Sequence, residues 1–280
     1  MPTVSAVERP VVAEPITELN LSVAWLRAFH MVTRPGVEAL APLVVTVLGF
    51  DDQGAPEQVP EVRALIDEAL LEQHDSKLAR RPKRAMLPLS CHTAANTIFP
   101  ESLWNRDRPR QELYSRYHAV RKTLRKDPRN RRGIYFERLI DYAGAPEEGN
   151  QLEHLIRLHE RDVKRLSAYQ ASISRPSEDL TGMPLQGFPC LQQIALHPDR
   201  GDGSLALTAF YGTQYIFERA YGNYLGLCRL GAFLAHEMGL RLGRMTCIAG
   251  HAPRGGITVT RARRLVDDSA KAIQSAGVPL

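Results

Sequence analysis

The sequence contains no run of about 18 apolar residues, so we expect no membrane-spanning helix. Its first fifteen residues lack a basic segment followed by an apolar stretch, so we expect no secretory signal. The four cysteines, at positions 91, 190, 228 and 247, form no CxxC pair, which argues against a disulfide scaffold and a zinc knuckle. Internal repeats and low-complexity tracts are also missing. These absences predict a cytoplasmic protein with reduced thiols and no metal site.

The composition is that of an ordinary globular protein. Of the 280 residues, 44% are hydrophobic and 24% are charged, which allows a sizeable core in one large α/β domain or two small ones. Residues 1–18 are rich in Pro, Val and Glu without periodicity, and we expect them to form a flexible arm.

The positive charge is concentrated in the middle of the chain. Residues 77–138 hold 17 Lys or Arg against 5 Asp or Glu, whereas the whole chain has a net charge of only +5. Such asymmetry indicates an anionic partner, which would be a phosphate, a polyglutamate tail or a nucleic acid. The alternative is a solvated basic face without a ligand.

The apolar periodicity predicts helices that alternate with strands. We expect helices capped at Ser22 and over 62–70, 113–124, 152–166, 223–239 and 262–273. We expect strands at 43–48, from 134 onward and at 245–248, together with a hairpin that pairs 191–196 with 204–211. Residues 74–84 are expected to form a surface loop.

Cys190 is the first candidate for chemistry. It follows Pro189 at the predicted start of a strand, where a side chain can face a cleft. A thiolate adds well to an electron-poor carbon, and a neighbouring arginine can hold it ionised. The other three cysteines are interpreted as small buried hydrophobic residues.

Asn223 and the Arg131-Arg132 pair complement this thiol. The asparagine amide donates and accepts in one plane, which matches the adjacent carbonyl and N–H of a uracil edge, although Asn223 can equally be a helix N-cap. Paired guanidinium groups bind phosphate, although such arginines are often only solvent-facing charges. Together these residues indicate a nucleotide-modifying enzyme.

Several of these segments resemble thymidylate synthases. The string Leu-Arg-Lys-Asp-Pro-Arg-Asn-Arg-Arg at 124–132 is similar to the stretch in which that family has a helix end, a Pro turn and paired arginines. Pro189-Cys190-Leu191-Gln192 resembles the nucleophile motif, and the strand pair, Asn223 and Gly250-His251 follow in the family's order. The resemblance covers residues 112–140 and 187–252.

The resemblance implies a fold and a reaction. Residues 19–280 would form a single α/β (α+β) domain, with a large twisted mixed β-sheet flanked by helices and paired in a homodimer. Cys190 would attack C6 of a pyrimidine nucleotide, and C5 would take a one-carbon unit from 5,10-methylenetetrahydrofolate. Asn223 would read the uracil edge, while Arg131 and Arg132 would reach the phosphate bound by the partner subunit.

The resemblance also supplies further site residues. His251 resembles a histidine that touches the sugar hydroxyl, with an ordinary core or surface histidine as the alternative. Tyr114 resembles a Tyr-Gly element, although Ser115 replaces the glycine. Glu101, near Trp104, is the nearest match for a general base. The remaining substrate-binding candidates are Gln192, Thr213 and Arg219.

The chain also departs from the family pattern. Gly212-Thr213 stand where the family carries an Arg-Ser pair, and Tyr215 replaces an acidic residue. Arg219 is the nearby cation that can substitute for the missing arginine. The substrate is therefore a pyrimidine nucleotide, a nucleoside or a free base.

Three functions follow from the sequence. The first is a folate-dependent C5 methyl- or hydroxymethyltransferase, and the second is a catalytically lapsed protein of the same fold that binds or regulates. The third is a nucleic-acid-binding protein, which we rank last because no helix in the basic segment has the aromatic interleaving of a stacking platform.

Overall fold

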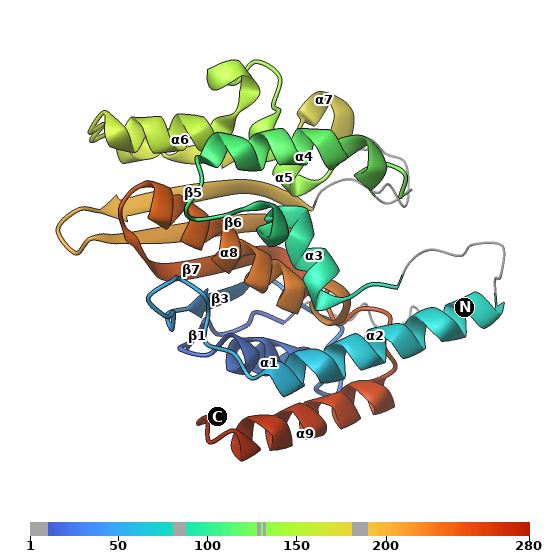
Figure 1. The fold of residues 1–280 in the computed structure, drawn as a ribbon. Helices are drawn as coiled ribbons and strands as arrows, with labels where there is room; N and C mark the ends of the chain where they lie inside the picture. Colours follow the sequence, from blue (N-terminus) through green and yellow to red (C-terminus); the bar gives the residue numbers. More distant parts are fainter. Residues whose placement is uncertain (1–10, 81–87, 128–129, 131–132, 181–189) are drawn as a thin grey trace, which may run out of the picture.

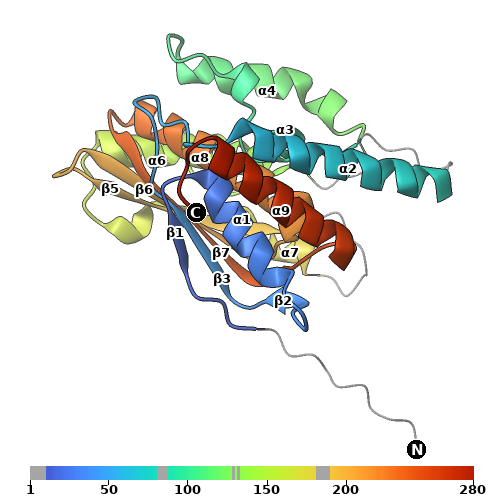
Figure 2. The same cartoon turned by 90° about the horizontal axis from the view of Figure 1, so that it is seen from below.

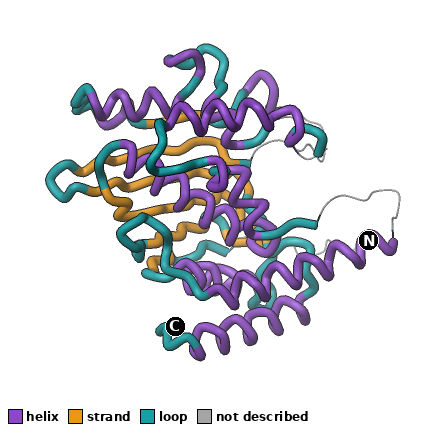
Figure 3. Tube along the Cα trace, viewed as in Figure 1, coloured by secondary structure: helices purple, strands orange, loops and turns teal. Residues whose placement is uncertain are grey.

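The computed structural model describes residues 11–80, 88–127, 130, 133–180 and 190–280. Within these ranges seven strands form one mixed sheet in the order β1-β3-β7-β6-β5-β4, with β2 paired to β7. The strands are β1 (Ile16–Glu18), β2 (Ala39–Leu40), β3 (Leu43–Val47), β4 (Gln170–Ser172), β5 (Leu191–Asp199), β6 (Ser204–Thr213) and β7 (Arg241–Pro253). Figure 3 shows them gathered in one layer with helices around it. The predicted mixed α/β architecture is confirmed.

The helices lie at both edges of the sheet and over one of its faces (Figure 1). The α-helices are α1 (Leu21–Val32), α2 (Pro60–Arg80), α3 (Cys91–Ile98), α4 (Arg110–Leu124), α5 (Tyr135–Ile140), α6 (Gln151–Glu160), α7 (Pro176–Asp179), α8 (Tyr221–Glu237) and α9 (Val259–Ser275). Short helical turns are η2 (Glu101–Leu103), η4 (Glu147–Gly149), η5 (Leu166–Ala168) and the π-helical η6 (Ile216–Ala220). Helices α4 to α7 lie on the β5 side of the sheet (Figure 1), where α5 and α6 contact β4, and α9 packs beside α1 and α2 (Figure 2).

The predicted hairpin is confirmed and is longer than expected. Strands β5 and β6 pair antiparallel over nearly their whole length, and alternate residues such as Ile194 and Leu207 face the core. At the turn, the Asp199 carboxylate accepts the backbone N–H groups of Gly201 and Asp202 at 2.9 and 3.1 Å. This is the local hydrogen bonding that favours Asp at the start of a turn.

Strand β7 is the centre of the sheet. It pairs antiparallel with β2 and β3 and parallel with β6. We expected only a short strand at 245–248, but β7 has 13 residues. Its ends were not recognised because Arg241, Arg244 and Gly250 interrupt the apolar alternation that marks a strand.

Helix α8 is buried on most sides, as its apolar sequence predicts. It packs closely against α3 because two glycines leave room for the neighbouring backbone. A Cβ atom at Gly222 would lie 2.5 Å from the Cys91 carbonyl oxygen, and one at Gly226 would lie 2.7 Å from the Ala95 carbonyl oxygen. Neither position therefore tolerates a side chain without movement of α3.

Two predicted elements are wrong in type or length. The predicted strand that begins at Ile134 is instead α5, for which Ile134 is the N-cap. The charged side chains of Glu137 and Arg138 are buried in this helix and form ion pairs, which override the β propensity of the three preceding apolar residues. The helix predicted over 152–166 ends at Glu160, and Asp162 follows with a φ of 54°.

The remaining differences concern helix ends. Residues 74–80 were expected in a loop but continue α2, where the Lys77 ammonium donates to the Gln73 side chain at 2.9 Å. Asn20, rather than Ser22, caps α1. The buried Ser22 hydroxyl instead lies 3.0 Å from the Tyr221 hydroxyl. Residues 16–18, assigned to the arm, form β1.

One ion pair is enclosed in the protein. The Arg138 guanidinium is 1% exposed and donates to both carboxylate oxygens of Asp179, at 2.5 and 2.9 Å. Asp179 also accepts the Arg175 backbone N–H at 2.8 Å. Burial alone would raise the pKa of Asp179, but the hydrogen bonds from Arg138 and Arg175 outweigh it and lower that pKa. The pair fixes the short helix α7 to α5.

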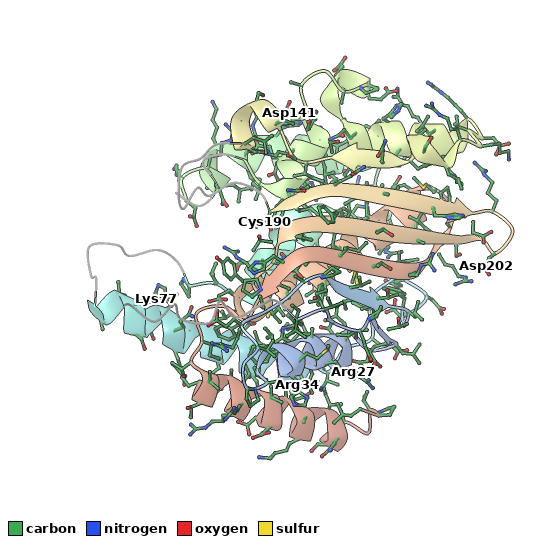
Figure 4. The ribbon with its side chains drawn as sticks, turned by 180° about the vertical axis from the view of Figure 1, so that it is seen from behind. Arg27, Arg34, Lys77, Asp141, Cys190 and Asp202 are labelled. Atoms are coloured by element: carbon green, nitrogen blue, oxygen red, sulfur yellow. The ribbon has the colours of Figure 1, made fainter. Side chains whose placement is uncertain are left out.

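The opposite face of the sheet carries no helix over β5, β6 and β7 in the described part of the chain (Figure 4). We call this surface the open sheet face. Its side chains are small, polar or partly exposed, and Phe210 is 39% exposed. Thr46 and Thr246 hydrogen-bond across β3 and β7 at 3.1 Å. The other members of the open sheet face are Val44, Gln193, Ala195, His197, Ala206, Thr208, Arg244 and Ile248.

None of the helices in the described ranges combines the length and apolar character needed to cross a membrane.

Candidate functional site

The ends of three neighbouring strands meet at Cys190. Strand β5 begins directly after this cysteine, β6 ends at Thr213, and β7 runs parallel to β6 past His251. The Gly212 backbone N–H donates to the Cys190 carbonyl oxygen at 3.2 Å, and Thr213 and His251 are register partners. Cys190 lies at the end of the hairpin opposite the turn that holds Asp202 (Figure 4). The structure therefore brings Cys190, Thr213 and His251 to one sheet end.

Cys190 is half-buried, whereas the other three cysteines are buried. This confirms the interpretation of Cys91, Cys228 and Cys247 as core residues. Burial raises the pKa of the Cys190 thiol, and the nearby Arg219 guanidinium partly counteracts that rise. Cys190 is thus the accessible thiol of the chain, and a cation is close to it.

Arg219 reaches this site from a π-helical turn. In η6 the Tyr215 carbonyl oxygen accepts two backbone N–H groups, from Arg219 at 3.0 Å and from Ala220 at 3.2 Å. Such turns accommodate one residue more than an α-helix does and occur often at functional sites. The sequence identified Arg219 as a substitute cation, and in the structure its charge acts on the Cys190 thiol.

Asn223 follows Arg219 by four residues. This spacing places two side chains on the same side of a helix. Asn223 is 4% exposed and is the third residue of α8, whose N-cap is Ala220. The alternative interpretation as an N-cap is therefore wrong. Within the described ranges no residue hydrogen-bonds the side-chain amide of Asn223, although this residue is buried.

Gln192 lies over Gly212. It is the extra residue of a bulge in β5, where the register shifts between Leu191 and Gln193. A Cβ atom at Gly212 would lie 2.9 Å from the Gln192 side-chain nitrogen, so the amide occupies the space next to that glycine. Gly250 also approaches, because its Cβ would lie 3.3 Å from the Gly212 carbonyl oxygen. A neutral amide and two glycines thus line this part of the site.

Two tyrosines that were not singled out in the sequence border Cys190. The Tyr135 hydroxyl oxygen accepts the Cys190 backbone N–H at 3.3 Å. The Tyr135 and Tyr211 rings meet edge to face with their centroids 6.3 Å apart. Tyr211 is fully buried, and its hydroxyl has no hydrogen-bond partner in the described structure. Tyr135 was missed because residues 134–136 were interpreted as a strand.

Tyr114 and Glu101 do not lie against Cys190. Tyr114 is buried on α4 beside Arg110 and Glu153. Burial, followed by the nearby Glu153 carboxylate, raises its pKa. Glu101 is 51% exposed and pairs with Arg229 of α8 at 2.8 Å. The Glu101 carboxylate is therefore exposed, paired with Arg229, and not in contact with the Cys190 thiol.

Arg131 and Arg132, the expected phosphate-binding pair, lie outside the described residues. Across the described ranges no three His, Cys, Asp or Glu side chains are arranged to hold a metal ion. Comparison with known proteins adds no family assignment: no protein-family model matches the chain, and no curated protein matches it.

Proposed function

We propose that this protein is an enzyme resembling thymidylate synthases, which adds Cys190 to C6 of a pyrimidine nucleotide or nucleoside and transfers a one-carbon group to C5. The observation that carries the proposal is the half-buried Cys190 thiol at this sheet end, together with the charge of Arg219, which acts on the thiol from the π-helical turn that leads to Asn223. These groups supply a nucleophile, a cation and a two-sided amide, which are the functions that such an addition requires.

The proposed chemistry begins with the thiolate. Its electron pair forms the S–C6 bond, and the pair of the C5–C6 double bond moves toward the C4 carbonyl oxygen. The Asn223 amide N–H stabilises that oxygen while the amide oxygen accepts the N3–H of the ring. C5 then carries the electron density that attacks a one-carbon electrophile.

The substrate is not held like an ordinary deoxyuridylate in this proposal. Gly212 offers no cation where the resembling family has an arginine, and the neutral Gln192 amide fills the adjacent space. Among the described residues, Arg219 is the cation whose charge lowers the pKa of Cys190. An anionic group of the ligand would therefore bind toward η6, whereas Gln192, Thr213 and His251 would contact the neutral sugar and ring.

The one-carbon donor would be methylenetetrahydrofolate, as the resemblance implies. A pterin presents an amidine edge that pairs best with a carboxylate. Among the described residues, Glu218 is the acid next to Arg219 in the sequence; its Oε1 accepts the Gly256 N–H at 2.8 Å and the Gln73 amide at 3.1 Å, whereas its Oε2 has no partner. One partly used carboxylate does not define a folate site, so no residue is assigned to the folate.

We also propose that two copies of the chain pair through the open sheet face. Phe210, exposed on β6, and Ile248, half-exposed on β7, belong to this face. Apolar side chains on an uncovered sheet favour contact with a second sheet. The family resemblance implies that, in such a homodimer, Arg131 and Arg132 of one copy would serve the site of the other.

The second candidate function is a catalytically lapsed binding protein. The observation in its favour is that burial raises the pKa of the Cys190 thiol despite Arg219, which reduces the thiolate fraction at neutral pH. Such a protein would retain the ligand contacts but form no covalent bond.

Intact-mass measurements test the proposal. The protein is incubated with 5-fluoropyrimidine nucleotides and nucleosides, with and without methylenetetrahydrofolate. We expect a covalent adduct in the wild type and in Cys91→Ala, a control at a buried thiol, but none in Cys190→Ala. Arg219→Gln should weaken nucleotide binding more than nucleoside binding, by about one to two decades.

The possible outcomes separate the two functions. An adduct that persists in Cys190→Ala contradicts the proposed nucleophile. Reversible binding of pyrimidines without an adduct in the wild type favours the lapsed binding protein.

A further inference from the structure

Gln192 presents a side-chain amide close to Cys190. It is the extra residue of the bulge in β5, and bulges often re-aim a side chain next to a functional site. Its backbone carbonyl oxygen accepts the N–H groups of Ile173 and Ser174, at 2.8 and 3.1 Å. These two bonds join the bulge to the segment that follows β4, so its backbone is fixed within the fold itself.

The Gln192 amide lies over Gly212 of the neighbouring strand. The Gly212 N–H donates to the Cys190 carbonyl oxygen at 3.2 Å, so this glycine is a cross-strand neighbour of the proposed nucleophile. A Cβ atom at Gly212 would lie 2.9 Å from the Gln192 side-chain nitrogen. The φ of Gly212 is not positive, so its backbone conformation does not require glycine. The missing side chain instead gives the amide its place.

This amide is unused within the protein. Gln192 is half-buried, and no described residue hydrogen-bonds its side chain. Gly212 follows the fully buried Tyr211, so position 212 faces the side of the sheet on which the described part of the chain places no helix. A side-chain amide offers an oxygen acceptor and an NH2 donor. A ligand that reaches Cys190 would therefore meet an unused donor and an unused acceptor here.

The side chains at this point are uncharged. Next to the Gln192 amide lie Gly212 and Gly250, whose Cβ atom would be 3.3 Å from the Gly212 carbonyl oxygen. A phosphate or carboxylate binds best to cations or to several N–H donors, and the amide oxygen would repel it. An uncharged group with one donor and one acceptor, such as a carboxamide or an imide edge, can instead use both edges of the amide.

We propose that Gln192 is a specificity-determining residue, which selects an uncharged donor–acceptor group of the ligand over a phosphate or carboxylate at the position beside Gly212. The amide NH2 would donate to a ligand carbonyl oxygen, and the amide oxygen would accept a ligand N–H. The inference rests on the proposed function for the identity of the nucleophile, and deepens it by naming the ligand group that lies beside Gly212.

The experiment compares two alkylating reagents on Cys190 in the full-length chain. Iodoacetamide carries a carboxamide and iodoacetate carries a carboxylate, so the ratio of their rates reports which group the site prefers. Both rates are measured at one pH, so the thiolate fraction cancels in the ratio. Because the other three cysteines are buried, the first alkylation reports on Cys190, which peptide mass spectrometry verifies.

The expected changes follow from the amide. Gln192→Ala should raise the iodoacetate-to-iodoacetamide rate ratio about fivefold, because only the neutral reagent loses a hydrogen bond. Gln192→Arg should raise it further, by about tenfold, because a cation favours the carboxylate. The matched control is Gln193, whose amide donates to Gln170 of β4, on the opposite side of β5 from Gly212. Gln193→Ala and Gln193→Arg should leave the ratio nearly unchanged.

Gly212→Ala tests the geometry. Its methyl group would displace the Gln192 amide, so this variant should reproduce the ratio of Gln192→Ala and should have no further effect in the Gln192→Ala background. Equal ratios in the wild type and both Gln192 variants overturn the proposal, as does an equal change in Gln193→Arg. Loss of the proposed dimer in Gln192→Ala without a change of ratio also overturns it, because the amide then serves the subunit contact.

Binding measurements separate this result from that of the proposed function. Pyrimidine nucleosides and nucleotides are titrated against the wild type and Gln192→Arg, which should favour the nucleotide by roughly tenfold to a hundredfold more than the wild type does. If the reagent ratio changes as expected but no pyrimidine binds, the role of Gln192 stands and the pyrimidine chemistry fails. If pyrimidines form an adduct but neither the ratio nor the preference changes, the reverse holds.

Discussion

The buried ion pair between Arg138 and Asp179 gives the sharpest stability prediction. Replacing Asp179 with Asn keeps the side-chain size but removes the buried carboxylate of the 1% exposed guanidinium, which keeps the exposed Glu178 carboxylate at 3.8 Å. Removing one partner of a buried pair costs roughly 3–5 kcal/mol, because the remaining charge is desolvated and less well compensated. We expect the lower part of this range, since the Ile173 carbonyl oxygen still accepts from Arg138 at 3.0 Å. The melting temperature should fall by on the order of 10 °C.

The matched control is an exposed pair of the same chemistry. Asp202 accepts two hydrogen bonds from Arg241, both at 2.8 Å, but the two side chains are 58% and 59% exposed. Urea unfolding of Asp179→Asn and Asp202→Asn therefore compares one interaction in two environments. Asp202→Asn should unfold at the wild-type urea concentration. Equal stability of the two variants at neutral pH would refute the argument from burial.

The same pair also predicts a pH dependence. The folded-state pKa of Asp179 is lowered, so its ion pair contributes stability above the unfolded pKa of about 3.9 and loses it as the pH falls through the lower folded value. The stability difference between the wild type and Asp179→Asn should therefore shrink below about pH 4. A difference that stays constant down to strongly acidic pH would contradict the assignment.

Two further predictions concern packing and assembly. Gly226→Ala should destabilise the protein by about 1–3 kcal/mol, because the new methyl would overlap the Ala95 carbonyl oxygen. Gly201→Ala, at an exposed turn, should leave the stability unchanged, and thermal melts of the two variants test the difference. Phe210→Arg on the open sheet face should convert the proposed dimer to monomer in analytical ultracentrifugation. Leu71→Arg, at a similarly exposed residue of α2, should leave the dimer intact, and a dimer that survives Phe210→Arg would place the interface elsewhere.

Apolar residues that repeat every second position, or about every 3.6 positions, correctly predicted the strands and helices that bury one face along their whole length. The hairpin, α4, α8 and α9 have alternating or amphipathic apolar residues, and each is present at the expected place. In contrast, α5 depends on the buried ion pairs of Glu137 and Arg138, whose partners come from distant segments. A local sequence window contains no information about such partners, so the apolar residues before them suggested a strand.

The same reasoning explains the site. Cys190, Arg219, Thr213 and His251 were grouped in advance by the family resemblance, and the pairing of β5, β6 and β7 brings Cys190, Thr213 and His251 to one sheet end. Tyr135 could not be grouped with them, because its contact with Cys190 depends on the position of α5 relative to β5. Glu101 was selected for its neighbour Trp104, but its carboxylate is paired with Arg229, whose position on α8 only the tertiary packing determines.

The π-helical turn at 216–220 allows the orientation of Arg219 to change independently of the packing of α8 in the core. The turn holds one residue beyond the α-helical repeat, and that residue sets the angle at which Arg219 leaves the helix relative to α8. Loss of a single residue there would restore α-helical winding and rotate the preceding side chains by about 100°. Helix α8 and its glycine contacts with α3 would stay where they are. A one-residue insertion or deletion thus offers evolution a way to exchange the cation beside Cys190 without repacking the interior.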